Sequence, residues 1–332
     1  MIIVMGATSF IGTYLVDALL SQGREVLATG YRNQNAEYFT SNRIPFVQLD
    51  VSKKEDFEKL PKHNIDAIFL LSVTNPVRDD GFPPQRYFDV NTIGALNVLE
   101  FSRINQVKKV IFGSSHADVA GLWEVGRPIT EQDEININFK SDHAVYIISK
   151  IAAINLIERY REAYGIVGIT LRLPGVYGYG QKTEIYLDGQ LKVPRFIVFI
   201  RNALAGNPIE IWGDPHRGHD FVYVKDVTSA YIAALDSTSA HGLYNIASGI
   251  RTSIEDEAKG IVEVFSSPAR RSEIIYRPEK PDIPHTFLYD ISKAKRELNY
   301  EVHYPFLEMI RDIKQEWELK RFPHLNIPWR TF

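Results

Sequence analysis

The sequence has no cysteine and no apolar run long enough to span a bilayer, and its charges nearly cancel. The missing cysteine excludes disulfides, thiolate metal sites and a catalytic thiol, and we expect no metal site. The longest apolar runs, as near residues 67–71, fall far short of the roughly 20 residues that a spanning helix needs. A net charge of -3, with scattered Lys and Arg, leaves no footprint for nucleic acid or membrane. We therefore expect a cytoplasmic protein that binds neither.

Up to about residue 175, short β-branched runs alternate with longer amphipathic stretches, the pattern of β-α-β units. The expected strands are Ile2–Met5, Glu25–Thr29, Pro45–Leu49, Ala67–Leu71, Lys109–Phe112 and Gly168–Leu171. Helices are expected near residues 11–22, 53–60, 85–105 and 143–165. The sequence thus predicts an α/β protein with a Rossmann-type, doubly wound parallel sheet.

After Pro174, glycines, prolines and aromatic residues replace this alternation, until a β run and a helix between Phe221 and Leu235 restore it. We expect two domains. Residues 1–173 and 219–245 form a dinucleotide-binding domain, and residues 174–218 and 246–332 form a smaller, mixed α/β substrate-binding lobe.

The first expected strand leads directly into a turn, GATSFIG, at residues 6–12. Gly6 permits a tight turn, and Gly12 lets the next helix pack close to the strand. The helix N-terminus, with Ser9, Phe10 and Ile11, directs main-chain amides toward a pyrophosphate. Ser9 stands where a glycine is usual, but it is small and its oxygen can bond phosphate. These residues predict a dinucleotide site.

The end of the second expected strand lacks the carboxylate that usually bonds the ribose 2′-hydroxyl of NAD. It reads Gly30-Tyr31-Arg32. A glycine at this position does not repel a 2′-phosphate as a carboxylate would, and Arg32 can pair with that phosphate. NADP is therefore slightly favoured over NAD. NAD stays open, because Arg32 can equally be a solvated loop charge. Asp50 and Val51, after the third strand, are expected to hold the adenine.

Tyr146 and Lys150 lie four residues apart on an expected helix, so both project from one face. A nearby ammonium favours the phenolate and lowers the pKa of a tyrosine toward that of an acid/base catalyst. The same spacing recurs at Tyr276/Lys280 and Tyr289/Lys293. Context selects the first copy, because the preceding strand leads into two serines at 114 and 115 that can bond a substrate oxygen.

Eight segments occur in an order typical of one family. They read GATSFIG, YFDVNTIGALNVLE, VKKVIFGSSHADVAG, YIISK, LRLPGVYGYGQ, HDFVYVKDV, LYNIASG and YDISKAKRELNY. Together they resemble the extended short-chain dehydrogenase/reductases, the group of NAD-dependent epimerases and dehydratases that act on nucleotide sugars. The resemblance runs to about Trp317. It implies an NAD(P) cofactor and a nucleotide-sugar substrate.

The resemblance also implies roles for single residues. Ser115 would be the hydroxyl partner, Tyr146 the acid/base and Lys150 its modulator, while Asn91 helps to organise the active site. The expected cofactor contacts are Gly6, Ser9, Phe10, Ile11, Gly12, Arg32, Asp50, Val51, Leu71, Asn91, Tyr146, Lys150, Pro174 and Val176.

Several expected substrate positions depart from the family pattern. Gly175 stands where an asparagine is common, and His219 where an arginine often binds the diphosphate. Arg217 or Arg277 can replace that charge, or can be loop residues. Residues 116 and 117 read His-Ala where the 4,6-dehydratases carry Asp-Glu, which disfavours dehydration. The substrate candidates are Ser114, His116, Gly175, Arg217, His219 and Arg277, with His116 open to a structural interpretation.

Three functions follow as expectations. The first is a nucleotide-sugar epimerase that retains its cofactor, and the second is an NADPH-dependent reductase of a nucleotide-linked keto sugar or another carbonyl. The third is a non-catalytic dinucleotide sensor, against which Ser115, Tyr146 and Lys150 argue. Two amphipathic helices, 85–105 and 143–165, suit a homodimer interface.

Overall fold

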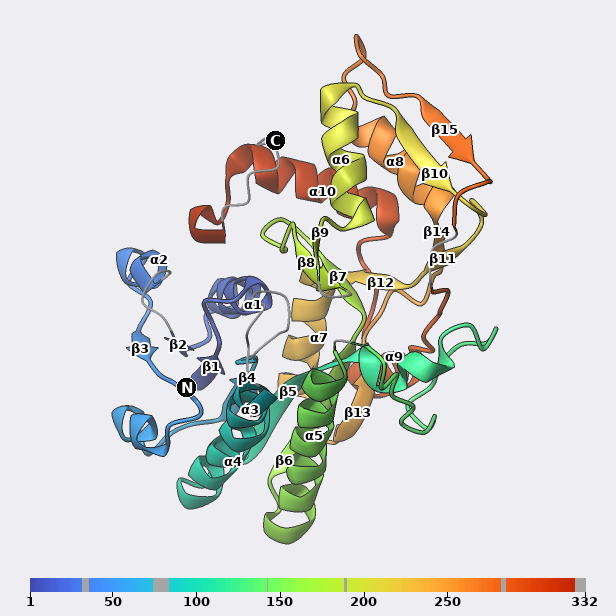
Figure 1. The fold of residues 1–332 in the computed structure, drawn as a ribbon. Helices are drawn as coiled ribbons and strands as arrows, with labels where there is room; N and C mark the ends of the chain where they lie inside the picture. The colour runs from blue at the N-terminus through green and yellow to red at the C-terminus, as the bar shows by residue number, and fades with distance from the viewer. Residues whose placement is uncertain (32–35, 74–83, 142, 188–189, 282–284, 326–332) are drawn as a thin grey trace.

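The computed structural model describes residues 1–31, 36–73, 84–141, 143–187, 190–281 and 285–325. No helix among these residues is long and apolar enough to cross a membrane. A seven-stranded parallel sheet with the order β13-β6-β5-β4-β1-β2-β3 forms its centre (Figure 1). This confirms the predicted fold class. The strands are β1 (Ile2–Met5), β2 (Val26–Gly30), β3 (Phe46–Gln48), β4 (Ala67–Leu70), β5 (Lys109–Ser115), β6 (Val167–Leu173) and β13 (Gly242–Asn245).

Helices cover both faces of this sheet. Because successive side chains of a strand point to opposite faces, Ile2 and Val4 of β1 join one apolar cluster, and Ile3 and Met5 join another. Helices α1 (Phe10–Ser21) and α7 (Val224–Asp236) pack on the first face, and α4 (Gly94–Ile104) and α5 (Ala144–Tyr164) on the second (Figure 1). Burial on both sides explains the continuous apolar strand sequences.

The observed helices and strands differ from the predicted ones at a few points. Strand β5 runs three residues past its predicted end, because Gly113, Ser114 and Ser115 pair with β6. The predicted helix 53–60 is a 3-10 helix, Lys54–Lys59. The predicted helix 85–105 is divided into α3 (Pro84–Tyr87), a π-helical turn (Phe88–Ile93) and α4. Helix α2 (Ala36–Ser41) was not expected from the sequence.

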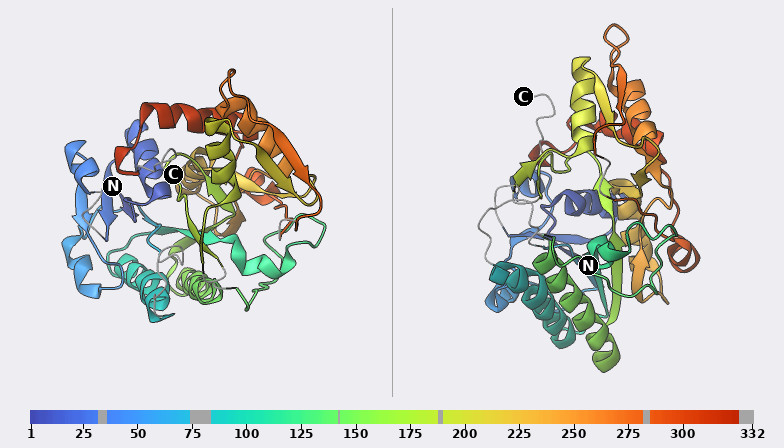
Figure 2. Two further views of the ribbon diagram at one scale, coloured as in Figure 1. Left: turned by 45° about the horizontal axis from the view of Figure 1, so that its top comes forward. Right: turned by 45° about the vertical axis from the view of Figure 1, so that its right-hand side comes forward.

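A smaller lobe lies beyond the end of β6, as the views in Figure 2 show. Its apolar cluster joins α6, α8 and α10 to the parallel pair β10 and β15. Strand β12 pairs with β7 and not with the large sheet. The predicted division of the chain into two domains stays a prediction. The bounds are β7 (Gly175–Tyr177), β8 (Ile185–Leu187), β9 (Gln190–Lys192), α6 (Arg195–Ala205), β10 (Ile209–Trp212), β11 (Gly218–His219), β12 (Phe221–Tyr223), β14 (Thr252–Ser253), α8 (Ile254–Phe265), β15 (Ile274–Arg277), α9 (Ser292–Leu298) and α10 (Phe306–Leu319).

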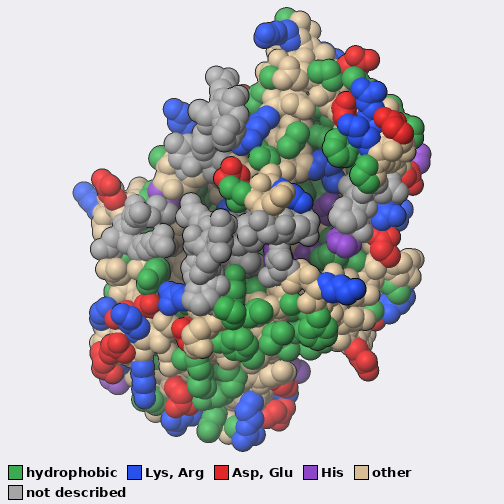
Figure 3. Space-filling view, in the orientation of Figure 1, with side chains coloured by type: hydrophobic (Ala, Val, Ile, Leu, Met, Phe, Trp, Pro, Cys, Tyr) green, Lys and Arg blue, Asp and Glu red, His purple; other side chains and the backbone are tan. Residues whose placement is uncertain are grey.

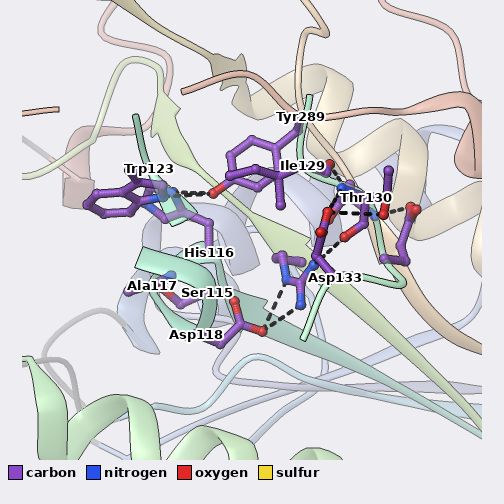
Figure 4. Close-up of polar contacts among 12 residues, drawn as sticks. Ser115, His116, Ala117, Asp118, Trp123, Ile129, Thr130, Asp133 and Tyr289 are labelled. Carbon is purple, nitrogen blue, oxygen red and sulfur yellow. Dashed lines mark hydrogen bonds and ion pairs between the residues drawn. The ribbon is translucent and has the colours of Figure 1, made fainter. Parts of the chain in front are cut away.

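A buried ion pair fixes the segment that follows β5 to the sheet (Figure 4). Arg172 of β6 donates from Nε and Nη2 to Oδ2 of Asp118, at 3.1 and 2.9 Å, and from Nη1 to Asn245 of β13 at 3.2 Å. The side chains of Arg172 and Asp118 are only 2% and 3% exposed. Removing one partner from such a pair costs about 3–5 kcal/mol, because a bare charge stays buried. The segment after Ser115 therefore has little freedom to move.

Candidate active site

The turn between β1 and α1 has the shape that a pyrophosphate requires. Gly6 has φ +88°, and a Cβ there would lie 2.7 Å from the amide nitrogen of Ser72. A Cβ on Gly12 would lie 2.2 Å from the carbonyl oxygen of Gly6, so any side chain would push helix α1 away from the strand. Both glycines are thus needed for the close approach that the sequence pattern predicts.

Ser9 begins helix α1 and caps it. Its Oγ accepts a hydrogen bond from the amide of Gly12 at 3.1 Å, which satisfies one of the free amides of the first turn. Because Oγ of Ser9 accepts in this bond, its own proton can still be donated to a phosphate oxygen. The contact of Ser9 with phosphate stays a prediction. Phe10 lies against Gly178 of the loop after β7, and Ile11 packs on the two adjoining apolar clusters.

Most of the other predicted contacts of the dinucleotide follow the carboxyl ends of strands β3, β4 and β6. Asp50 follows β3 and accepts from the amide and hydroxyl of Ser52, and Val51 is buried against Gly94. Leu71 follows β4, and its carbonyl carbon would lie 2.8 Å from a Cβ on Gly6. Pro174 separates β6 from β7, which contains Val176. Arg32 lies outside the described residues.

Sequence reasoning missed a second arginine, which lies beside the residues expected to hold the adenosine. Arg86 of α3 lies over the ring of Tyr31, with its guanidinium carbon 5.2 Å from the ring centroid. One of its nitrogens is 3.7 Å from a carboxylate oxygen of Asp50. No sequence pattern pointed to Arg86, because Asp50 and Tyr31, its neighbours in space, are 36 and 55 residues away in the chain.

Ser115, Tyr146 and Lys150 meet at the end of β5, where the N-terminal half of α5 packs on the strand. The hydroxyl of Ser115 lies close enough to the phenol of Tyr146 to lower its pKa. Nζ of Lys150 donates to the carbonyl of Gly113 and lies 4.3 Å from the centroid of the Phe112 ring and 6.0 Å from that of Tyr146. Lys150 is 2% exposed and Tyr146 9% exposed. The three residues thus form one cluster, as the sequence predicts.

Asn91 is linked to the same cluster by two hydrogen bonds in series through Ser149. It lies in the π-helical turn between α3 and α4, where an extra residue widens the helix. Its Nδ2 donates to Oγ of Ser149 at 2.9 Å, and that hydroxyl donates to the carbonyl of Tyr146 at 2.6 Å. Asn91 therefore fixes the backbone of the turn of α5 that carries Tyr146; its role in the active site stays a prediction.

Burial sets the proton affinities of this cluster. It raises the pKa of Tyr146 well above the usual value for a tyrosine, while the bond from Ser115 opposes that rise. The expected lowering by Lys150 is not found, because burial and the Ser115 hydroxyl are the only causes of the shift. Burial also lowers the pKa of Lys150 to about 7. Tyr146 is therefore protonated at neutral pH, as a proton donor to a carbonyl oxygen must be.

The two other Tyr-Lys spacings have different surroundings. Tyr276 is exposed on β15 and bonds Glu255, so it is a surface residue. Tyr289, in contrast, is 2% exposed and bonds both His116 and Trp123, beside the end of β5. The third Tyr-Lys spacing, which the sequence context did not favour, therefore places its tyrosine next to the candidate site. Its lysine, Lys293, lies elsewhere and bonds the carbonyl of Leu243.

Aromatic and imidazole rings gather beside the catalytic cluster. His116 contacts Trp123, Phe287 and Tyr289, and His219 contacts Phe287. Burial lowers the pKa values of His116 and His219 to about 3 each, so both are neutral at physiological pH. Figure 3 shows histidine side chains in the hollow between the sheet domain and the smaller lobe.

The other substrate candidates are less favourably placed. Oγ of Ser114 is buried, without a partner among the described residues. Arg217 pairs with Glu124 at 2.8 Å and Arg277 with Glu210 at 3.1 Å, so each guanidinium already has a carboxylate. A Cβ at Gly175 would make only ordinary contacts, the nearest at 3.6 Å from Tyr177. Their substrate roles stay predictions.

The Arg172–Asp118 pair was also missed, although one signal was present. Arg172 interrupts the apolar run of β6, and a charge inside a buried strand requires a partner. The sequence contained the arginine but nothing that identified Asp118, since 54 residues separate the two.

Comparisons with known proteins agree with this geometry. Residues 2–247 match the model of the NAD dependent epimerase/dehydratase family. A putative UDP-glucose 4-epimerase of Methanocaldococcus jannaschii is 30% identical over 301 residues, which cover 89% of this chain and 91% of that protein. Two solved structures share the fold at 24% identity. UDP-glucose 4-epimerase of Thermotoga maritima, with UDP-glucose, has a TM-score of 0.79 and coverage of 96% and 99%. That of Thermus thermophilus, complexed with NAD, has a TM-score of 0.74 and coverage of 95% and 97%.

We expect Lys150→Met to stabilise the protein without bound cofactor. Because the pKa of Lys150 falls from 10.5 to about 7, the folded protein binds fewer protons than the unfolded chain between these pH values. The amine therefore destabilises the fold most at pH 7 and below, and least near pH 10. Scanning calorimetry should show a melting temperature raised by roughly 2–4 °C at pH 7 and by less at pH 9.5.

Lys59→Met, at a side chain that is 51% exposed, is the control and should change equally little at both pH values. A Lys150→Met protein that melts at or below the wild-type temperature at pH 7 would contradict the assignment of a destabilising buried amine.

Proposed function

The chain belongs to the NAD dependent epimerase/dehydratase family, and from that premise we propose that it is a nucleotide-sugar 4-epimerase whose substrate is a UDP-hexose. As a member it is an enzyme with an NAD(P) cofactor. The observation that carries the proposal is the cluster of Ser115, Tyr146 and Lys150 at the end of β5. The substrate is suggested by the 30% identical relative, whose name is putative UDP-glucose 4-epimerase.

Each residue of the cluster has a distinct task in this proposal. Ser115 and the phenol of Tyr146 hold the reacting oxygen of the sugar between two hydroxyl groups. Tyr146 gives its proton to that oxygen when it is a carbonyl, and takes the proton back when it is a hydroxyl. Lys150, when protonated, favours the phenolate. A bound nicotinamide supplies the hydride acceptor and donor, and the glycine turn at 6–12 holds its pyrophosphate.

Conversion of UDP-glucose to UDP-galactose tests the proposal. We expect the purified protein to interconvert the two, followed by chromatography, with no net consumption of NAD(P)H. Tyr146→Phe should lower kcat by 100-fold or more, because the proton donor is lost, while the affinity for cofactor is kept. Tyr276→Phe, at the exposed copy of the spacing, should retain wild-type activity.

An unchanged kcat in the Tyr146→Phe protein would overturn the mechanism. Stoichiometric oxidation of NADPH with a nucleotide-linked keto sugar, without epimerisation, would instead establish the reductase.

The proposal also gives NADP a slight preference over NAD. No carboxylate stands at the end of β2, where NAD-specific sites bond the ribose 2′-hydroxyl. Gly30 is closely approached by Thr8, so this position has no room for a side chain. The guanidinium of Arg86 lies beside Tyr31 at the same strand end, where it can reach a 2′-phosphate. Together with Arg32, Arg86 would favour the phosphorylated cofactor.

Arg86→Ala should therefore weaken the binding of NADPH by about 10-fold and leave that of NADH within about 2-fold, measured by fluorescence titration. Arg103→Ala removes an arginine of the neighbouring helix α4 that pairs with Glu100, and should change neither. Equal losses for both cofactors in Arg86→Ala, or tighter NADH binding by the wild type, would contradict the preference.

A second copy of the chain is the partner that completes the proposal. Exposed apolar side chains gather over α4 and α5, as Figure 3 shows, with Ile104 61% and Tyr164 54% exposed. Large exposed apolar surfaces mark association sites. Light scattering should give twice the chain mass of 37.9 kDa, and Ile104→Glu should lower it. Val198→Glu, on α6, should leave it unchanged; a wild type with the mass of one chain would refute the dimer.

A further inference from the structure

Two side chains of the segment after β5, His116 and Trp123, form a hydrogen-bonded row with the distant Tyr289 beside Ser115 (Figure 4). Nε1 of Trp123 lies 3.2 Å from the hydroxyl of Tyr289, and that hydroxyl lies 3.0 Å from Nδ1 of His116. The rings also pack on one another, with centroids of His116 and Trp123 4.8 Å apart. The row thus has both polar and packing contacts that hold His116 in place.

The chemistry of the donors fixes the direction of each bond. The indole nitrogen of Trp123 can only donate, so the oxygen of Tyr289 accepts from it. Tyr289 is 2% exposed, and among the described residues His116 is the only other hydrogen-bond partner of its hydroxyl. The phenol proton is therefore donated to Nδ1 of His116, because otherwise it would be buried without an acceptor. His116 then carries its own proton on Nε2.

Nε2 of His116 is left free to meet a ligand. The two ring nitrogens point in different directions, so the bond of Nδ1 to Tyr289 turns Nε2 away from the row. Within the described part of the chain, Nε2 has no hydrogen-bond partner, and His116 is only partly buried. His116 also directly follows Ser115, whose hydroxyl lowers the pKa of Tyr146. The imidazole thus belongs to the same strand end as the reacting groups.

We propose that His116 binds the substrate directly: its Nε2–H, oriented by Tyr289 and Trp123, donates to a sugar oxygen beside the one that Ser115 and Tyr146 hold. Tyr289 and Trp123 are positioning residues, since they act only through the imidazole. This assignment rests on the proposed function and deepens it, because it adds a third hydroxyl-reading group to the site.

The charges around His116 define which sugars fit. The neighbouring imidazole of His219 is neutral, and the charge of Arg172 is compensated by Asp118. His116 itself is neutral, since burial lowers its pKa to about 3. A neutral donor matches a hydroxyl or carbonyl oxygen, whereas among the described residues no uncompensated cation contacts the His116 ring to balance a carboxylate. The site therefore suits an uncharged hexose better than a hexuronate.

Steady-state kinetics with UDP-glucose as the probe test the assignment. His116→Leu keeps the bulk of the ring but removes the donor, and should raise KM about 3- to 10-fold with little change in kcat. His116→Gln offers an amide N–H and should recover part of that loss. Tyr289→Phe leaves His116 in place without its orienting bond, and should raise KM by a smaller factor. Cofactor affinity should be unchanged in all three.

Tyr276→Phe is the matched control, since it removes a tyrosine hydroxyl that does not contact His116. Equal KM values for wild type, His116→Leu and His116→Gln would show that His116 only packs, and would overturn the assignment while the epimerase proposal stands. A kcat that falls with unchanged KM in His116→Leu would also overturn it. A wild type that does not act on any UDP-hexose would overturn both.

Discussion

The buried ion pair between Arg172 and Asp118 is the constraint on which one wall of the active site depends. An arginine in the middle of a parallel sheet needs a compensating charge, and Asp118 supplies it from the segment that follows β5. The same guanidinium bonds Asn245, so the ends of β5, β6 and β13 converge on one side chain. Ser115 and His116 lie three and two residues before Asp118, and their positions are fixed because breaking this ion pair would leave a charge buried.

Helix α5 forms the opposite wall of the site, and a different set of buried hydrogen bonds holds it in place. Asn91, in its π-helical turn, bonds Ser149 and through it the carbonyl of Tyr146. The burial that fixes both walls also determines their charge, since it raises the pKa of Tyr146 and lowers those of Lys150 and His116. A site built from such neutral donors and acceptors is suited to the hydroxyl and carbonyl oxygens of an uncharged sugar.

Local patterns in the sequence predicted most of the sheet and the catalytic cluster, because both depend on short-range signals. The glycine turn at 6–12, the strand periodicity and the four-residue spacing of Tyr146 and Lys150 are all readable within one segment. What could not be predicted depends on long-range contacts: the partner of Arg172, the place of Arg86 beside Tyr31, and the approach of Tyr289 to His116. The rise in the pKa of Tyr146 was missed for the same reason, since burial is a property of the folded chain.

The central claim is that a hydride leaves a sugar carbon and returns to it at the Ser115–Tyr146–Lys150 cluster. The most direct measurement follows deuterium placed on C4 of UDP-glucose, with mass spectrometry of the UDP-glucose and UDP-galactose formed at equilibrium in ordinary water. The account predicts that the deuterium is retained in both sugars, because it passes to the bound nicotinamide and back without meeting solvent. Its replacement by hydrogen from water would show that C4 is deprotonated instead, and would contradict the account.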